Sequence, residues 1–230
     1  MTRMRWIWLS SGLLYLLFFS WYTSFGGPLT EEEIGKYLEH FDQRGVQPEQ
    51  RIMLERFMRA DTGDDFVVLN AIDLYETPLQ IEGVEPDDSS SDVLDKYMEF
   101  MYPALFARAS HPVIFGEAAN TAIDLMNSPG MEHWTQGAMM RYRSRRDFFD
   151  ITSNPAFSGS HDFKVAALRK TIAFPIDPWF QLGDPRLVVA LLLGLLAMGL
   201  SWREAATGAR VPKDDAVSYT HLTLPTIYSV

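Results

Sequence analysis

The stretch RYRSRRDFFD, Arg141 to Asp150, places four arginines within six positions of a chain whose net charge is −10. Such a run is either an anion-binding site or the end of a strand followed by the start of a helix. In a strand, alternate side chains share a face, so Arg141 and Arg143 point the same way. Ser144 is a good helix N-cap, and Asp147 favours the positive end of a helix dipole. The run therefore predicts mainly a strand-to-helix junction.

Further strands and helices are expected on both sides of this junction. Residues 65–76 are rich in apolar and β-branched side chains, which is typical of a strand. Residues 91–109 carry one apolar stripe at helical spacing, and Pro103 inside it should kink the helix. Further strands are expected at residues 111–118, 134–143 and 170–176, the last ending at Pro175 or lying at a sheet edge. The resulting order, βαββαβ, predicts an α+β, ferredoxin-like domain over residues 65–178.

Residues 30–60 are expected to form a separate helical hairpin before this domain. Thr30 and Glu33 have the spacing of a capping box, and apolar residues follow at helical spacing. Gly45 ends the first helix, and Pro48 stands in the first turn of the second.

A resemblance to a known superfamily supports this order. YMEFMYPALFARASHPVIFGEA, from Tyr97, resembles the first helix and second strand of small dimeric α/β-barrel domains, which include antibiotic-biosynthesis-monooxygenase-like and NIPSNAP-like proteins. Tyr97, Pro103 and Gly116 match a tyrosine, a mid-helix proline and a strand-ending glycine there. HWTQGAMMRYRSRRDFFDITSNPAF resembles the third strand and second helix. The resemblance covers about half the chain and implies a homodimer in which two sheets close one barrel. Members differ in chemistry, so the fold implies no particular reaction.

Two apolar segments flank the domain. Trp6 to Phe25 contains twenty residues without a charge, which as a helix would cover about 30 Å, the thickness of a bilayer core. A cleaved signal peptide is the alternative, because MTRMR resembles its positive start. Leu187 to Trp202 is shorter and would cover about 24 Å. A buried soluble helix is the alternative there, although this segment has no polar face. We expect two transmembrane helices, at 6–25 and 187–202.

The basic residues that flank these segments predict an orientation. Arg3 and Arg5 precede the first segment, and Arg203, Arg210 and Lys213 follow the second. By the positive-inside rule, both termini are cytoplasmic and residues 26–186 lie outside a cell membrane. Residues 217–230, VSYTHLTLPTIYSV, look like the translated read-through of a sequencing adaptor, so we exclude them from fold prediction.

Charge and residue types exclude several classes of function. The acidic excess lies in residues 26–186 and would repel nucleic acid phosphates. The chain has no cysteine, which excludes disulfides, thiolate nucleophiles and sulfur-based zinc sites. The histidines have neither an i, i+4 pair nor an HExxH spacing, so no metal and no cofactor are expected. Ser160, His161 and Asp162 are neighbours in sequence and cannot form a catalytic relay.

Five residues remain candidates for binding a ligand. Asn70 is polar within an apolar strand, Tyr97 and Trp134 could line a cavity, and Arg141 and Arg143 could hold an anion. Core packing and pairing with carboxylates are the competing interpretations. The sequence favours a membrane-anchored, dimeric domain that binds a small molecule or a partner protein without catalysis. The alternative is an enzyme of the cofactor-independent oxygenase or isomerase kind, with these residues around a cavity between sheet and helices.

Overall fold

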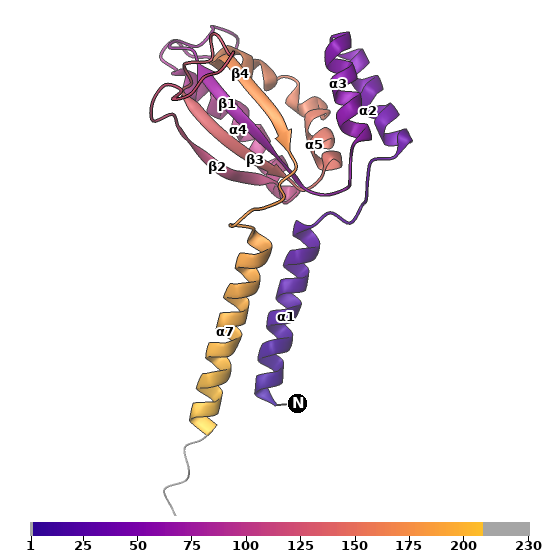
Figure 1. Cartoon of the computed structure of the whole chain (residues 1–230), viewed down its shortest axis with the longest axis vertical. Coiled ribbons are helices and arrows are strands. Elements are labelled where there is room, and N and C mark those ends of the chain that lie inside the picture. The colour runs from indigo at the N-terminus through magenta and orange to yellow at the C-terminus, as the bar shows by residue number, and fades with distance from the viewer. Residues whose placement is uncertain (1, 209–230) are drawn as a thin grey trace, which may run out of the picture. The chain divides into compact units, whose positions relative to one another are not determined.

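The computed structural model describes residues 2–208 (Figure 1). Their contacts divide them into two units, one formed by residues up to Tyr15 together with residues from Leu187, the other by Leu16–Arg186. The second unit contains the sheet. The tail at 217–230 lies outside the described residues.

The sheet has four antiparallel strands in the order β2-β3-β1-β4. The strands are β1 (Phe66–Leu74), β2 (His111–Glu117), β3 (Gln136–Tyr142) and β4 (Leu168–Ile176). Helix α4 (Ser90–Ala107) connects β1 to β2, and α5 (Arg145–Thr152) with α6 (His161–Ala167) connects β3 to β4. Strand β1, the first in sequence, lies between β3 and β4, as in the ferredoxin-like βαββαβ topology. The structure thus confirms the predicted ferredoxin-like arrangement, while α6 was not predicted.

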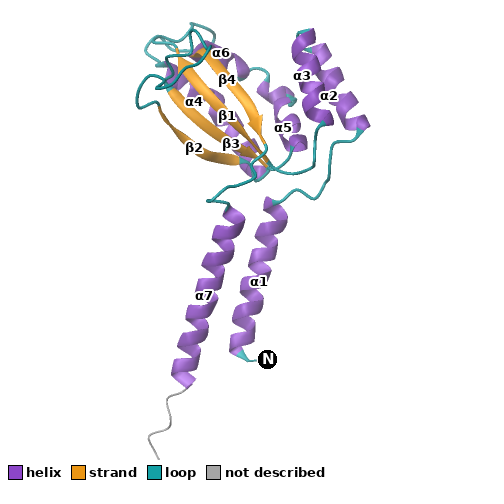
Figure 2. Cartoon of the chain, in the orientation of Figure 1, coloured by secondary structure: helices purple, strands orange, loops and turns teal. Residues whose placement is uncertain are grey.

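One face of the sheet packs against the helices and the other is open. Phe66 and Tyr142 lie on the covered face, in a core that α4 and α5 complete with Met101, Leu105 and Ile151. Because side chains alternate along a strand, Val67, Leu69 and Ala71 lie on the opposite face. Figure 2 shows the sheet in orange with α4 behind it.

A helical hairpin precedes the sheet in the chain. Helix α2 (Glu31–Gln43) begins with the capping box of Thr30 and Glu33, and α3 (Pro48–Arg59) has Pro48 in its first turn. Its apolar side chains form a second core with Phe149 of α5; they are Leu29, Ile34, Tyr37, Leu38, Phe41 and Met58. The hairpin therefore packs on α5.

Helices α1 (Arg3–Tyr22) and α7 (Pro185–Gly208) hold the two apolar segments. Among the described residues, only α7, over Pro185–Thr207, is long and apolar enough to cross a membrane. The prediction of two such spans is therefore corrected to one candidate. The physical reason is composition, because α1 has fewer aliphatic residues and includes tryptophans, tyrosines, serines and two arginines. The length and the lack of charge of residues 6–25 had predicted a second span, which the composition of α1 does not support.

Candidate functional site

The side chain of Arg141, near the end of β3, is buried and fully paired. It is 1% exposed. Nε donates to Asp65 Oδ2 at 2.8 Å, Nη1 to the Ala109 carbonyl at 2.7 Å and Nη2 to the Tyr22 carbonyl at 3.1 Å. The guanidinium also lies over the Tyr22 ring, 3.8 Å from its centroid. Each of its three nitrogens thus has a protein partner.

Arg143 binds the same turn of α1. Its Nη1 donates to the Trp21 carbonyl at 3.1 Å, while Nε and Nη2 form a bidentate pair with Asp147 at 2.7 and 2.9 Å. The last carbonyls of a helix have no partner within it, and cations are favoured at that negative end. Arg143 and Arg141 therefore cap the C-terminus of α1.

The next two arginines, in the first turn of α5, bind other segments. Arg145 Nη1 donates to the Phe57 carbonyl of α3 at 2.5 Å. Arg146 Nε donates to Glu33 of α2 at 2.6 Å, and Nη2 donates to the Pro28 carbonyl at 3.2 Å. The hydrogen bond from Arg146 is the main reason why the pKa of Glu33 falls from 4.5 to about 2. The four arginines of the junction therefore join α1, the following linker, α2 and α3 to the sheet.

Asp65, directly before β1, extends these contacts to the start of α7. It accepts hydrogen bonds from Arg141 and from Arg186, whose Nη2 lies 3.2 Å from Oδ2. The Tyr22 hydroxyl lies 2.7 Å from His111 Nε2, at the start of β2. We call these five residues, Tyr22, Asp65, His111, Arg141 and Arg186, the junction cluster. All five belong to the unit Leu16–Arg186.

The sequence had drawn attention to Arg141 but not to its partners. Asp65 and Arg186 each stand at the border of an apolar element, immediately before a strand and at the start of a helix. The charge of each residue at such a border was the only signal that the sequence offered. The pairing of Asp65 with Arg186, 121 residues away, could not be predicted from it. The prediction that Arg141 and Arg143 hold an anionic ligand remains untested. In this structure their donors are bound to the protein's own oxygens.

The other three candidate residues have separate surroundings. The Asn70 amide donates to the Val68 carbonyl at 3.1 Å, on the helix-covered face of the sheet. Tyr97 packs against two apolar clusters around α4, and its burial raises the pKa of its hydroxyl to about 12. The Trp134 indole donates to the Met131 carbonyl at 2.9 Å. Asn70 and Arg141 lie on opposite faces of the sheet, so the five residues do not form one site.

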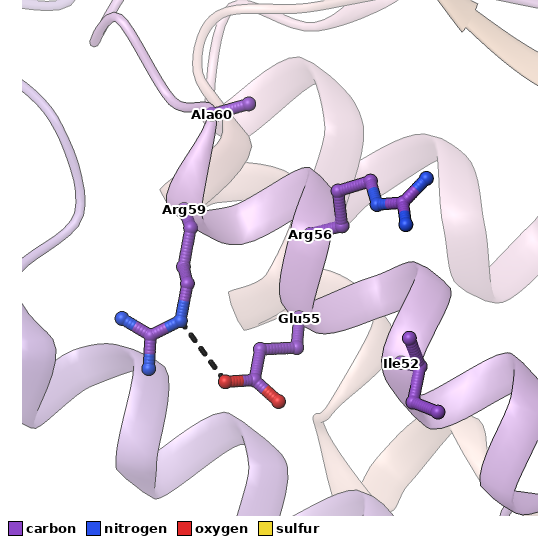
Figure 3. Close-up of a pocket in the computed structure, with 5 residues that line it drawn as sticks. All are labelled: Ile52, Glu55, Arg56, Arg59 and Ala60. Atoms are coloured by element: carbon purple, nitrogen blue, oxygen red, sulfur yellow. Dashed lines mark hydrogen bonds and ion pairs between the residues drawn. The ribbon is translucent and has the colours of Figure 1, made fainter.

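Among the described residues, α3 and α6 each border a surface hollow. One, of about 450 Å³, lies on α3 and is lined by Ile52, Glu55, Arg56, Arg59 and Ala60 (Figure 3). Figure 3 shows that Arg59 is bound to Glu55, with Nε and Oε1 2.9 Å apart. The second, of about 390 Å³, lies between α6 and the loop after β1. None of the five candidate residues lines either hollow.

Comparisons with known proteins add distant structural likenesses. No protein-family model matches the chain, and no curated protein matches it. The RPA0582 protein of Rhodopseudomonas palustris, of unknown function, is similar over 59% of this chain and 98% of its own, at 18% identity and TM-score 0.46.

The cofactor-independent oxygenase SnoaB of Streptomyces nogalater is similar over 53% of this chain and 99% of its own, at 12% identity and TM-score 0.30. A dimeric, ferredoxin-like protein of unknown function from Bacteroides fragilis is similar over 50% and 96%, also at 12% and 0.30. Likenesses this distant do not identify a function, so the fold assignment rests on the strand order.

Proposed function

We propose that this protein is a membrane-anchored, ferredoxin-like domain that binds a partner through the open face of its sheet, and that the partner is a second copy of the chain. The observation that carries the proposal is the composition of that face. Its exposed apolar side chains come from the two edge strands: Ile114 of β2 is 58% exposed, and Phe174 and Ile172 of β4 are 46% and 37% exposed. Leu69 and Met139 lie between them, as the strand pairing requires. Apolar patches that span several strands are typical of association surfaces.

A second copy suits this surface because an apolar sheet face can pack against an identical apolar face. The apolar residues of the open face are uncharged and of similar size, so two such sheets can pack face to face at about 10 Å. Closed symmetric dimers are the commonest assemblies of identical chains. In this proposal the domain binds a partner and catalyses no reaction. The dimer is proposed to bind a small molecule or another protein in turn.

Helix α7 supports the proposed anchoring. Its leucines are largely exposed, as Leu191, Leu192 and Leu195 show at 57%, 61% and 61%. The residues just before it include Trp179 at 97% exposure and Phe180 at 69%. Aromatic rings beside an apolar helix are typical of the membrane interface. A lipid environment would cover all of these side chains.

Helix α1 is proposed to lie beside α7 in the membrane. Arg3, at the start of α1, is 3.5 Å from Glu204, near the end of α7. The two helices are therefore antiparallel, and the N-terminus of α1 and the C-terminus of α7 lie on the same side. By the positive-inside rule, the basic residues Arg3, Arg5 and Arg203 support the proposal that this side is cytoplasmic and that residues 26–186 are extracytoplasmic.

The cap on α1 supports retention of this helix in the mature chain. Arg141 and Arg143 bind the carbonyls of Tyr22 and Trp21, so these two residues form part of the unit that contains the sheet. Cleavage as a signal peptide would leave the buried Arg141 without two of its contacts. An intact-mass measurement of protein isolated from membranes tests this, and a mass without residues 1–26 contradicts retention.

Native mass spectrometry of the full chain in detergent tests the proposed dimer. We expect a dimer for the natural sequence and a monomer for Phe174→Asp, because burying an unpaired carboxylate at an apolar interface is costly. Ile52→Asp on α3, where Ile52 is 59% exposed, is the matched control and should remain dimeric. A monomeric natural protein, or a Phe174→Asp variant that still dimerises, would refute the proposal. A defined additional mass on the dimer would identify a small-molecule ligand class.

A further inference from the structure

A second polar cluster lies at the other end of β1 from the junction cluster. It is centred on Asp73, and its cations come from segments distant in sequence, namely His133, Arg169 and Lys170. We call these four residues the Asp73 cluster. Asp73 and Lys170 are paired across β1 and β4, on the open face of the sheet. None of the contacts that hold α1 or the helical hairpin involves these residues.

Asp73 is the buried centre of this cluster. Its side chain is fully buried. Arg169 donates to Oδ2 through Nε at 2.8 Å and through Nη2 at 2.5 Å. Burial by itself raises the pKa of Asp73. The hydrogen bonds from Arg169 and His133 lower the pKa by more than burial raises it, so the net shift is downward. Asp73 is therefore a carboxylate at neutral pH.

His133 is oriented by this carboxylate. Its Nδ1 lies 3.2 Å from Asp73 Oδ1. Because an ionised carboxylate only accepts hydrogen bonds, Nδ1 carries the proton and donates it. The second polar atom of the ring is Nε2, and the His133 side chain is 58% exposed. Nε2 has no protein partner among the described residues.

The cluster has more cationic groups than Asp73 needs. Arg169 alone neutralises Asp73, through two of its three nitrogens, and its side chain is still 52% exposed. Lys170 Nζ lies 4.0 Å from Asp73 Oδ2, donates to the Gly130 carbonyl at 2.6 Å and sits 4.5 Å from the centre of the Trp134 ring. The surplus positive charge occurs in a chain of net charge −10.

From this geometry we propose that the Asp73 cluster is a binding site for a small anionic group, a carboxylate or a phosphate. The anion is held by the Arg169 nitrogen that Asp73 does not engage and by Lys170, and His133 lies beside it. Asp73 is a positioning residue, which fixes the ring of His133 and the plane of Arg169. Trp134, which the sequence suggested as a ligand residue, borders the site through its contact with Lys170.

This inference does not rest on the proposed dimer, although Lys170 lies on the sheet face through which the dimer is proposed to form. A monomeric protein that bound anions at the cluster would refute the dimer alone, and a dimer without anion binding would refute the site alone. The two outcomes are thus distinguishable in one preparation of the full chain.

The test is a titration of the full chain in detergent, with the ring signals of His133 observed by nuclear magnetic resonance. Inorganic phosphate and acetate are the two probes, in separate titrations at constant ionic strength. We expect saturable shifts of the His133 signals with at least one probe. Binding of phosphate alone identifies a phosphate ligand, and binding of acetate alone or of both identifies a carboxylate or a general anion site.

Lys170→Gln is the principal variant, because Lys170 is not in direct hydrogen-bonding contact with Asp73. It should weaken binding of the anion about tenfold or more, as expected for loss of one charged hydrogen bond. Lys36→Gln, which removes an exposed lysine of α2, is the matched control and should bind as the natural protein does. Arg169→Gln should abolish binding, and its unfolding midpoint shows separately whether Asp73 still supports the fold. No saturable shift with either probe, or equal binding by Lys170→Gln, would overturn the proposal.

Discussion

Individual charged residues carry much of the tertiary organisation of this protein. Arg141 is the clearest case, because it is buried and its partners are Asp65, the Ala109 carbonyl and the end of α1. A guanidinium has a planar set of donors that can meet oxygens from several directions, which a lysine ammonium cannot reproduce. The residue that seemed most suited to binding an external anion instead binds internal oxygens.

Replacing Arg141 by methionine should therefore destabilise the domain strongly. Breaking a buried ion pair by removing one partner costs about 3–5 kcal/mol, because the other polar groups stay buried. Denaturant unfolding of the full chain in detergent measures the loss. Arg56→Met, which removes an exposed arginine of α3, serves as the control and should change stability little. Equal losses in the two variants would contradict the assigned role of Arg141.

Glu33 should make the stability of the hairpin depend on acid pH. Its pKa lies at about 2 in the folded protein, below the ordinary value of 4.5, chiefly through the hydrogen bond from Arg146. A depressed pKa contributes stability above the ordinary pKa, and this contribution is lost as the pH falls from 4.5 to about 2. Glu33→Gln should therefore lose less stability over this range than the natural chain.

Unfolding midpoints measured across that pH range provide the comparison. Glu32→Gln is the matched control, since Glu32 is its neighbour in α2 and makes no ion pair among the residues described here. If the Glu33→Gln and Glu32→Gln profiles coincide, the contact with Arg146 does not contribute to acid stability.

The secondary-structure elements follow local signals in most places. Ser89 and Ser144 each accept a hydrogen bond from a backbone amide three residues on, and each begins a helix, α4 and α5 respectively. Pro103 lies inside α4, which nevertheless continues to Ala107 because its apolar residues pack on the sheet and α6. Helix α6 escaped prediction because it has only seven residues, fewer than a reliable helical period needs.

The two serine caps should differ in importance. Ser144 is buried, at 3% exposure, and its hydroxyl also donates to Asp147, which in turn binds Arg143. Ser144→Ala should cost about 1–2 kcal/mol, whereas Ser89→Ala, at an exposed cap, should cost about 1 kcal/mol or less. Chemical denaturation of both variants checks this order. A larger loss for Ser89→Ala would mean that the junction does not depend on its cap.

The complete chain combines a ferredoxin-like unit with two long apolar helices. In the described residues only α7 has the composition of a membrane span, and α1 accompanies it through the ion pair between Arg3 and Glu204. The unit Leu16–Arg186 meanwhile includes the end of α1 and the start of α7 through the junction cluster. These contacts connect both helix ends to the sheet, and Asp65 takes part at both, because it binds Arg141 and Arg186.

Deleting residues 2–15 together with residues 187–208, which removes most of both helices proposed to lie in the membrane, should release the protein from membranes under alkaline carbonate. The natural chain should stay in the membrane fraction, because removing some twenty apolar residues from lipid is very unfavourable. A reporter enzyme that is active only outside the cytoplasm should work when fused after Asp184 and fail when fused after Gly208. Extraction of the natural chain by carbonate, or the reverse reporter pattern, would contradict the proposed anchoring.

The sequence by itself determined the βαββαβ order without α6, the capped start of α5 and the apolar character of α7, because each depends on residues that are neighbours along the chain. Hydrophobic period, capping residues and prolines act within a few positions, so they can be read without coordinates. Only the tertiary structure decided what the four arginines of the opening stretch bind, since their partners come from α1, α2, α3, the end of α4 and the residues before β1. It also brought Asp73, His133, Arg169 and Lys170 together, although no local pattern links them. The charge of a residue can be read from the sequence, but the oxygen atom that it binds depends on how distant segments pack.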